Sequence, residues 1–408
     1  MILSIITQLT EVFQYEWALR AIIASSLVGI MCGILGCFII LRNMALIGDA
    51  LSHAILPGVV VGFIVAGHSV LAFFTGAVLA GLITAVLITW IQRNVKAKDD
   101  AAIGIVFTVM FALGVMGISW VSRQEGVHLD MKDFLFGNVL GIANQDLWLT
   151  SLVTIYVILC IIFFYRYFFI TTFQQVLATT MGISVSTLHY FLMLLLSFAV
   201  VASLQSVGVI LVIAMLIIPA STAYLLTSRL HIMIILSAFI GLLSTVAGLF
   251  IAIVLETTPG PAMTVTAAGF YAIAVFLAPE KGLLFSYIRQ RNKKIKIMKE
   301  DLLKDILRLW EEGSFSYENL RGKSGLNKYS LNSKIIKLKR TGMISGEGNN
   351  LNLTEKGSAA ANQLVRAHRL WETYMVNTLG FDKDQIHDQA EKYEHLLPET
   401  LLNKVDKN

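Results

Sequence analysis

Asp49 and His53 lie four residues apart in the apolar stretch DALSHAILPGV (49–59). If this stretch is a helix, one of its faces presents a carboxylate and an imidazole one turn apart. A mixed oxygen and nitrogen pair suits Mn²⁺, Fe²⁺ or Zn²⁺ better than Cu(I), which prefers thiolate ligands. Two ligands do not complete a coordination shell, so a second subunit across a symmetric interface would have to supply the others.

The same spacing also fits a purely structural pair, in which Asp49 and His53 hydrogen-bond each other or a backbone carbonyl. Burying a charge at membrane depth costs at least about 2.5 kcal/mol, which argues for a partner or a ligand. Spacing alone does not separate the two interpretations. Pro57 and Gly58 follow the pair directly and favour a broken helix, a feature of transporter substrate sites.

The chain around this pair is rich in apolar residues. Of its 408 residues, 56% are hydrophobic, and several runs reach the roughly 20 residues that a membrane-spanning helix needs. We therefore predict an all-α polytopic membrane bundle with about nine transmembrane helices. Most Lys and Arg residues outside the spans fall on the inner connections if the N-terminus is outside and the C-terminus inside. The predicted spans are 17–41, 44–66, 71–92, 101–121, 147–166, 186–204, 207–227, 232–255 and 264–280.

Three segments resemble the manganese, zinc and iron permeases of ATP-binding-cassette importers. They are RNMALIGDALSHAILPGVVVG (42–62), SLQSVGVILVIAMLIIPASTA (203–223) and PGPAMTVTAAGFYAIAVFLAP (259–279). The resemblance implies that residues 1–285 form a metal permease of a bacterial plasma membrane, with Asp49 and His53 lining the metal path. The implied cargo is Mn²⁺, with Fe²⁺ or Zn²⁺ as alternatives.

The same resemblance implies three protein partners: a cytoplasmic ATPase, an extracellular solute-binding lipoprotein, and a second permease subunit that is identical or homologous. The segment FQQVLATTMGISVS (173–186) matches the ATPase-docking region, with Ala178 and Gly182 at its small positions. RGKS (321–324) is the nearest approach to a phosphate-binding loop, but Tyr317 stands where that motif requires its first glycine. We therefore expect a transport subunit rather than an enzyme, with the ATPase on a separate chain.

The charge pattern changes after residue 280, because residues 281–408 hold 23 of the 32 Lys and Arg residues. We expect a basic linker at 286–299, followed by a cytoplasmic tail. Helical patterns and a final hairpin predict a winged helix-turn-helix over 300–357. The expected elements are helices at 301–313, 316–325 and 327–344 and a hairpin at 345–357.

The basic stretch 321–340 of this predicted unit is suited to nucleic-acid phosphates. A solvated basic face, or a segment held against anionic membrane lipid, explains the same charges. The second half of the stretch, NSKIIKLKR, would be the recognition helix. Its candidate DNA-contacting residues are Asn332, Ser333, Lys334 and Lys337.

Histidine and glutamate residues accumulate toward the C-terminus. Glu391, Glu394 and His395 would share a helical face, as a divalent-metal site needs, although an exposed helix with solvated side chains has the same pattern. Residues 301–397 resemble metal-dependent repressors of the diphtheria-toxin-repressor and manganese-transport-regulator type, above all in LTEKGSAAANQLVRAHRLWETYMVNTLGFDKDQIHDQAEKYEHLL (353–397). The resemblance implies a truncated, helical metal-binding and dimerisation segment over 358–408.

The ligands implied by this second resemblance favour Mn²⁺, because Glu391 stands where the iron-responsive branch has cysteine. Lys304 departs from the pattern, since the manganese regulators offer a carboxylate there. The principal hypothesis is therefore a permease with a metal-responsive tail. The alternative is a membrane-tethered, metal-dependent transcription regulator. The implied ligands in the tail are Asp301, His368, Glu372, His387, Glu391, Glu394 and His395.

Overall fold

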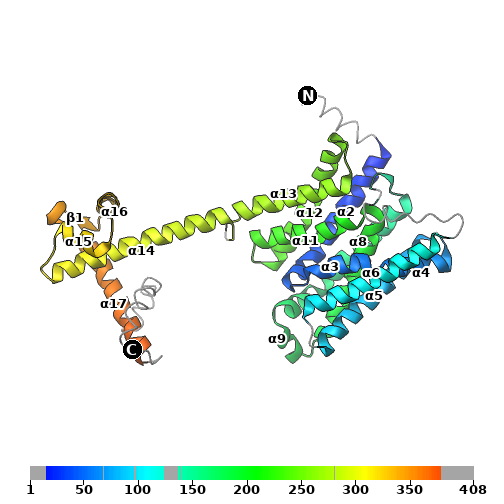
Figure 1. Ribbon diagram of the computed structural model, residues 1–408, viewed down its shortest axis with the longest axis horizontal. Helices are drawn as coiled ribbons and strands as arrows, with labels where there is room; N and C mark the ends of the chain where they lie inside the picture. The colour runs from blue at the N-terminus through cyan, green and yellow to red at the C-terminus, as the bar shows by residue number, and fades with distance from the viewer. Residues whose placement is uncertain are drawn as a thin grey trace. The chain divides into compact units, whose positions relative to one another are not determined.

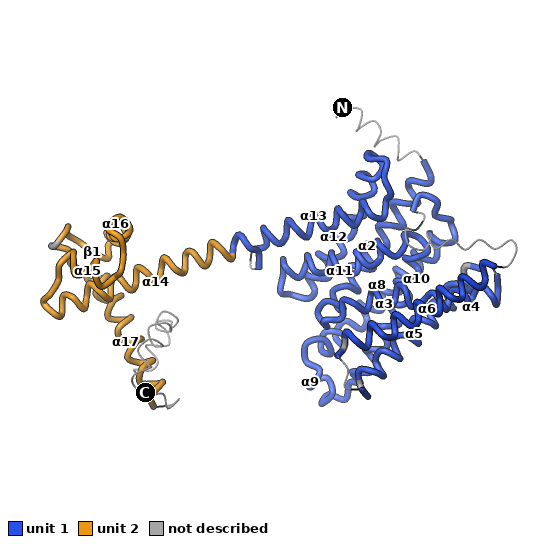
Figure 2. Tube along the Cα trace, in the orientation of Figure 1, with its two compact units in different colours: residues 1–285 blue, residues 286–408 orange. Residues whose placement is uncertain are grey.

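The computed structural model describes residues 15–67, 69–95, 98–123, 137, 139–279 and 281–377. The chain divides into two compact units, Met1–Phe285 and Ser286–Asn408 (Figure 2). Among the described residues, unit 1 is built from helices, and unit 2 combines helices with a two-stranded sheet (Figure 1).

Unit 1 is a bundle of apolar helices. In the described part of the chain, nine segments are long and apolar enough to cross a membrane, and each overlaps one of the nine predicted spans. The prediction of about nine apolar helices is therefore confirmed. The elements are α2 (Glu16–Leu41), α3 (Ala45–Ala54), α4 (Leu56–Ala66), α5 (Val70–Asn94), α6 (Asp99–Val121), η1 (Val139–Gly141), α8 (Asn144–Phe173), α9 (Gln175–Thr180), α10 (Val185–Val207), α11 (Val209–Leu226), α12 (Leu230–Val254) and α13 (Pro259–Leu277).

The structure differs from the predicted spans mainly at helix ends. The predicted span 147–166 belongs to α8, which continues to Phe173 because neither proline nor glycine interrupts it. The last predicted span starts at residue 264, whereas α13 begins at Pro259. Proline is well suited to a first helical turn, where its fixed φ is compatible with the helix and no N–H is required.

Helix α2 lies at the centre of unit 1. In its most apolar 18-residue window, 72% of the residues are buried, compared with 28% for α6 and for α8. It packs against α8 through Phe38 and Phe168, whose ring centroids are 5.4 Å apart. On its other side, Ser237 of α12 donates a 2.7 Å hydrogen bond to the Gly33 carbonyl. Helices α3, α10 and α11 also pack against α2.

Unit 2 has its own small hydrophobic core. Its elements are α14 (Leu283–Glu311), α15 (Tyr317–Ser324), α16 (Lys328–Arg340), β1 (Ile344–Ser345), η2 (Gly348–Asn350), β2 (Asn352–Leu353) and α17 (Glu355–Asn377). Leu302, Leu303 and Ile306 are buried on α14 and belong to the same cluster as Leu331 and Leu338 of α16. These apolar side chains join α14 and α16 in one core.

The ends of the unit 2 elements are set by local hydrogen bonds and by glycine. Ser316 caps α15 by accepting a 3.3 Å hydrogen bond from the Asn319 N–H. The predicted helix 327–344 ends earlier, at Arg340, because Gly342 adopts a left-handed φ of 68°. The predicted linker 286–299 is helical and belongs to α14.

Strands β1 and β2 pair in antiparallel fashion. Ile344 lies opposite Leu353, and Ser345 lies opposite Asn352. The predicted hairpin 345–357 is shorter in the structure, since α17 already begins at Glu355. The order of α15, α16 and this strand pair is the order that the sequence predicts.

Candidate metal sites

Asp49 and His53 lie on α3 and face the same side of it. His53 Nε2 is 3.7 Å from Asp49 Oδ1, and the His53 and Asp49 side chains are 19% and 46% exposed, respectively. This distance exceeds that of a hydrogen bond. The pair therefore presents an oxygen and a nitrogen on one face of α3 without a direct hydrogen bond between them.

Two aromatic rings of α6 hold the imidazole of His53. The ring centroid of Phe107 lies 5.6 Å from that of His53, and Phe111 meets the imidazole edge-on at 5.4 Å. These apolar rings offer no metal ligand, but they restrict the orientation of the imidazole. The sequence analysis missed both residues, because phenylalanine in an apolar span looks like any lipid-facing residue. Their i, i+4 spacing was the only available signal.

The helix that carries the pair is broken directly after it. Helix α3 ends at Ala54 and α4 begins at Leu56, with Pro57 in the first turn of α4. Proline has no N–H, so Pro57 cannot donate the usual helical hydrogen bond to the His53 carbonyl. The structure thus contains the break that Pro57 and Gly58 predict.

Glycine lets α6 approach this break closely. A Cβ at Gly114 would overlap the Cβ of Leu56 and lie 3.1 Å from Cδ of Pro57. By contrast, a Cβ at Gly104 of the same helix would meet no atom within 4 Å. The absence of a side chain at Gly114 therefore allows α6 to support the break beside His53.

The pair does not form a complete metal site within the described part of the chain. No group of three or more His, Cys, Asp or Glu side chains that could hold a metal is present among the described residues. Asp49 is also half-exposed at the surface of unit 1. Further ligands would therefore have to come from elsewhere.

The predicted ATPase-docking residues lie in and after the short helix α9. Ala178 is fully buried, and Gly182 has a φ of 78° with open space where a side chain would be. Large apolar side chains around them point outward, since Val176 is 79% and Met181 60% exposed. The segment therefore presents an apolar surface on a tight turn.

In unit 2, α17 brings together two of the predicted metal ligands. His368 Nε2 and Glu372 Oε1 are 3.0 Å apart, and the His368 side chain is only 4% exposed. Asp301 lies half-buried on α14. The structure does not gather these three described residues into one metal-binding group. The other predicted ligands, His387, Glu391, Glu394 and His395, lie outside the described residues.

Several charged side chains of α14 lie next to the hydrophobic core of unit 2. Lys304, which departs from the repressor pattern, is 4% exposed on α14. Burial raises the pKa of the neighbouring Asp305, and the carboxylate of Asp301 adds to that effect, whereas Lys323, Lys304 and Arg308 oppose it. A cationic side chain thus occupies the region where the resemblance places metal ligands.

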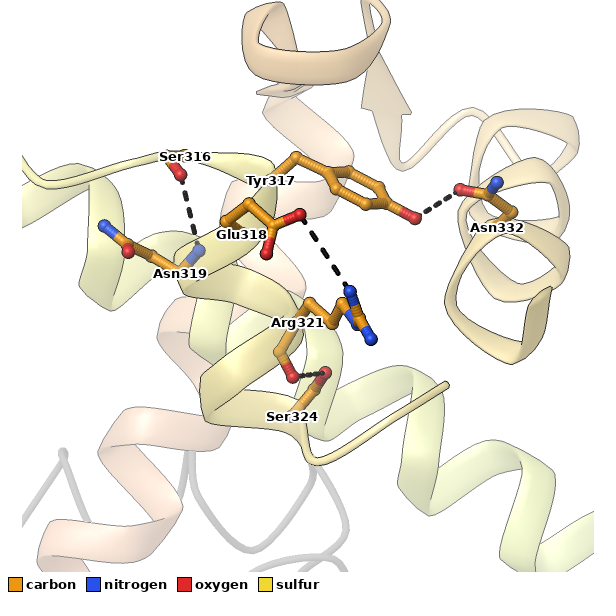
Figure 3. Close-up of polar contacts among 7 residues, drawn as sticks. All are labelled: Ser316, Tyr317, Glu318, Asn319, Arg321, Ser324 and Asn332. Carbon is orange, nitrogen blue, oxygen red and sulfur yellow. Dashed lines mark hydrogen bonds and ion pairs between the residues drawn. The ribbon is translucent and has the colours of Figure 1, made fainter. Parts of the chain in front are cut away.

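The candidate DNA-contacting residues on α16 have different environments. Asn332 accepts a 2.6 Å hydrogen bond from the Tyr317 hydroxyl of α15 (Figure 3). Ser333 and Lys337 are exposed. Lys334 Nζ is buried without a hydrogen-bond partner among the described groups, and this desolvation lowers the pKa of Lys334. Asn332, Ser333 and Lys337 are therefore exposed to solvent, and of these Asn332 is held by its hydrogen bond to Tyr317.

Comparisons with known proteins match one family within unit 1 and another within unit 2. Residues 14–278 match the ABC 3 transport family, and residues 354–408 match the iron dependent repressor, metal binding and dimerisation domain. A manganese transport system membrane protein of Halalkalibacterium halodurans is 45% identical over 284 residues, which are 70% of this chain and 95% of that protein.

Two further matches cover different lengths of the chain. A manganese transport system membrane protein of Bacillus subtilis is 33% identical over 370 residues, 89% of this chain and 84% of that protein. Its similarity therefore extends beyond unit 1. The solved structure of PsaBC from Streptococcus pneumoniae in complex with Fab has a TM-score of 0.61 and 42% identity, covering 69% of this chain and 98% of that chain.

These matches confirm the predicted combination of a metal permease with a repressor-like segment. The first family covers most of unit 1, where the Asp49–His53 pair lies. The second covers α17, where His368 and Glu372 lie. The chain belongs to the ABC 3 transport family and carries, in its second unit, an iron-dependent-repressor metal-binding and dimerisation domain.

Proposed function

We propose that this chain is the membrane-spanning permease of an ATP-driven importer that moves Mn²⁺ inward, with Fe²⁺ or Zn²⁺ as alternative cargo. The observation that carries the proposal is the Asp49–His53 pair, whose oxygen and nitrogen lie 3.7 Å apart beside a helix break. Relatives described as manganese transport proteins support Mn²⁺ as the cargo.

Asp49 would place a negative charge on the metal path. His53 would make the path selective against ions that prefer oxygen ligands. A neutral imidazole binds Mn²⁺, Fe²⁺ and Zn²⁺, whereas Mg²⁺ and Ca²⁺ prefer oxygen. The exposure of Asp49 on unit 1 leaves room for ligands from a second permease subunit, identical or homologous. Two copies related by a two-fold axis would place two such pairs around one path.

Energy and cargo would come from partner proteins. The exposed apolar side chains of α9, together with Ala178 and Gly182, would dock a cytoplasmic ATPase. An extracellular solute-binding lipoprotein would deliver the metal from the opposite side. This arrangement requires the N-terminus outside and the C-terminus inside, an orientation that the distribution of Lys and Arg favours.

Uptake of ⁵⁴Mn²⁺ by cells that express the complete importer tests this proposal. Asp49→Ala and His53→Ala should each abolish uptake, while membrane insertion and ATPase assembly remain normal. Leu46→Ala is a matched control, because Leu46 is also exposed on α3 but carries no ligand. Normal uptake by both ligand variants would refute the proposed path.

For unit 2 we propose a winged helix-turn-helix followed by a metal-binding segment that senses cytosolic Mn²⁺. Support comes from the order of α15, α16 and the β1–β2 pair, and from the repressor-domain match over 354–408. His368 and Glu372 supply a nitrogen and an oxygen, a donor set that fits Mn²⁺. The remaining proposed ligands are Asp301, His387, Glu391, Glu394 and His395.

Metal-dependent DNA binding by the tail is the second candidate function. The exposed Ser333 and Lys337 on α16 favour it, whereas the buried Nζ of Lys334 argues against a DNA contact by that residue. Fluorescence anisotropy of labelled promoter DNA with the full-length protein in nanodiscs, with and without Mn²⁺, distinguishes the two. Metal-dependent, sequence-preferring binding would establish DNA recognition, and its absence would leave the sensor role.

A further inference from the structure

A polar pocket of about 410 Å³ lies where several spans of unit 1 end at one membrane face. Helix α2 ends there and α3 begins, and the last turns of α5 and α8 and the first turn of α10 contribute the other walls. None of the described residues that line it is acidic. Its polar lining residues include Arg42, Asn43, Thr89, Gln92, Gln175 and His189.

The guanidinium of Arg42 is held in a defined position in this pocket. Its Nε donates a 3.2 Å hydrogen bond to Thr172 Oγ1, and one terminal nitrogen donates a 2.9 Å bond to Thr171 Oγ1. These bonds use two of the five N–H groups of arginine. The threonine contacts therefore orient the guanidinium without neutralising its charge.

A second nitrogen-bearing side chain of the pocket is also oriented. His189 Nε2 lies 3.3 Å from Thr89 Oγ1. The Thr89 hydroxyl donates its hydrogen to the Ala85 carbonyl at 2.8 Å, so it accepts from His189. Arginine and histidine thus line one pocket together with neutral amides, and because the His189 Nε2–H is used by Thr89, the guanidinium and the amides supply the donors for an occupant.

This set of groups selects the charge of the occupant. A fixed guanidinium with no carboxylate among the described lining residues repels a divalent cation, so the pocket is not a continuation of the Asp49–His53 path. Arginine binds phosphate through paired, charge-assisted hydrogen bonds. Basic pockets between spans at a membrane face are known to bind the head groups of anionic lipids.

We propose that this pocket binds a phosphate group, supplied by an anionic phospholipid of the adjacent leaflet or by a soluble phosphate compound. The pocket reaches Gln175, the first residue of α9. A bound phosphate would therefore brace the turn between α8 and α9 against α2. This inference is independent of the metal that the permease carries.

Native mass spectrometry of the full-length protein from nanodiscs of phosphatidylglycerol and phosphatidylcholine tests the proposal. Arg42→Gln should lower the apparent affinity for phosphatidylglycerol about tenfold or more, since a charge-assisted hydrogen bond is lost. Gln92→Glu should also lower the apparent affinity for phosphatidylglycerol, because it places a carboxylate in the pocket while Arg42 and its threonine contacts remain. Arg229→Gln is the matched control, because Arg229 is exposed and does not line the pocket.

A parallel thermal-shift titration with inorganic phosphate separates the two sources. Stabilisation by phosphatidylglycerol alone assigns the pocket to lipid, and stabilisation by inorganic phosphate as well assigns it to the phosphate group in general. Equal lipid retention by all variants, with no response to phosphate, would overturn the proposal. So would a loss of ATPase assembly in Arg42→Gln without any change in lipid retention, because the occupant would then be the partner protein.

Discussion

His53 Nε2 and Asp49 Oδ1 are separated by 3.7 Å, which is too far for a hydrogen bond and close to the distance that a shared metal ion requires. Two atoms that are each about 2.1 Å from one tetrahedral ion lie about 3.4 Å apart. A small rotation of either side chain would suffice to reach this distance. The two residues therefore do not hydrogen-bond each other directly at this separation, which is compatible with the proposed metal-binding pair and with an ion pair.

The rings of Phe107 and Phe111 should affect the apparent affinity for the cargo. Phe111→Leu removes the edge-on contact that restricts the His53 imidazole, so KM for Mn²⁺ uptake should rise several-fold with a smaller change in maximal rate. Phe239→Leu is the control, since Phe239 is 57% exposed on α12. Identical KM values for the two variants would show that Phe111 does not position the imidazole.

Gly114 and Gly104 should respond oppositely to alanine, although both lie in α6. The methyl group that Gly104→Ala adds would lie in open space. This substitution should therefore stabilise the helix by about 0.5–1 kcal/mol. Gly114→Ala forces a methyl group against Leu56 and Pro57, and such overpacking costs about 1–3 kcal/mol. Thermal unfolding in detergent measures both changes. Equal shifts for the two variants would contradict the close approach of α6 to the break.

The sequence predicts the spans well because about 20 apolar residues must satisfy their backbone hydrogen bonds within one helix to cross a membrane. Helix ends such as Pro259 depend on local geometry and were less predictable. The contact of Phe107 with His53 could not be predicted, because an apolar sequence does not show which of its residues contact another span. Lys334 was misleading in another way, since its charge indicates an exposed surface but its Nζ is buried.

Metal binding by the tail should depend on His368 and Glu372. His368→Ala should lower the Mn²⁺ affinity of unit 2 by about tenfold or more, because a ligand is removed. Glu372→Gln should also lower it, since a neutral amide replaces the carboxylate that lies 3.0 Å from the imidazole. Isothermal titration of full-length protein that carries Asp49→Ala isolates the tail signal. Thr373→Ala is an exposed control on the same helix, and equal affinities in all three variants would exclude a metal site at His368.

Substitutions of Lys334 and Lys337 on α16 should have different effects on stability and on DNA binding. Burial lowers the pKa of Lys334 below that of the unfolded chain, so between these two pKa values the unfolded state binds more protons and stability rises with pH. Lys334→Met should abolish this rise and stabilise unit 2 slightly at neutral pH, because an ammonium without a hydrogen-bond partner is removed. Thermal unfolding from pH 7 to 10 measures both effects. Lys337→Gln, at an exposed position, should leave stability unchanged and weaken any DNA binding, whereas a stability loss in Lys334→Met would show that its ammonium has a stabilising partner.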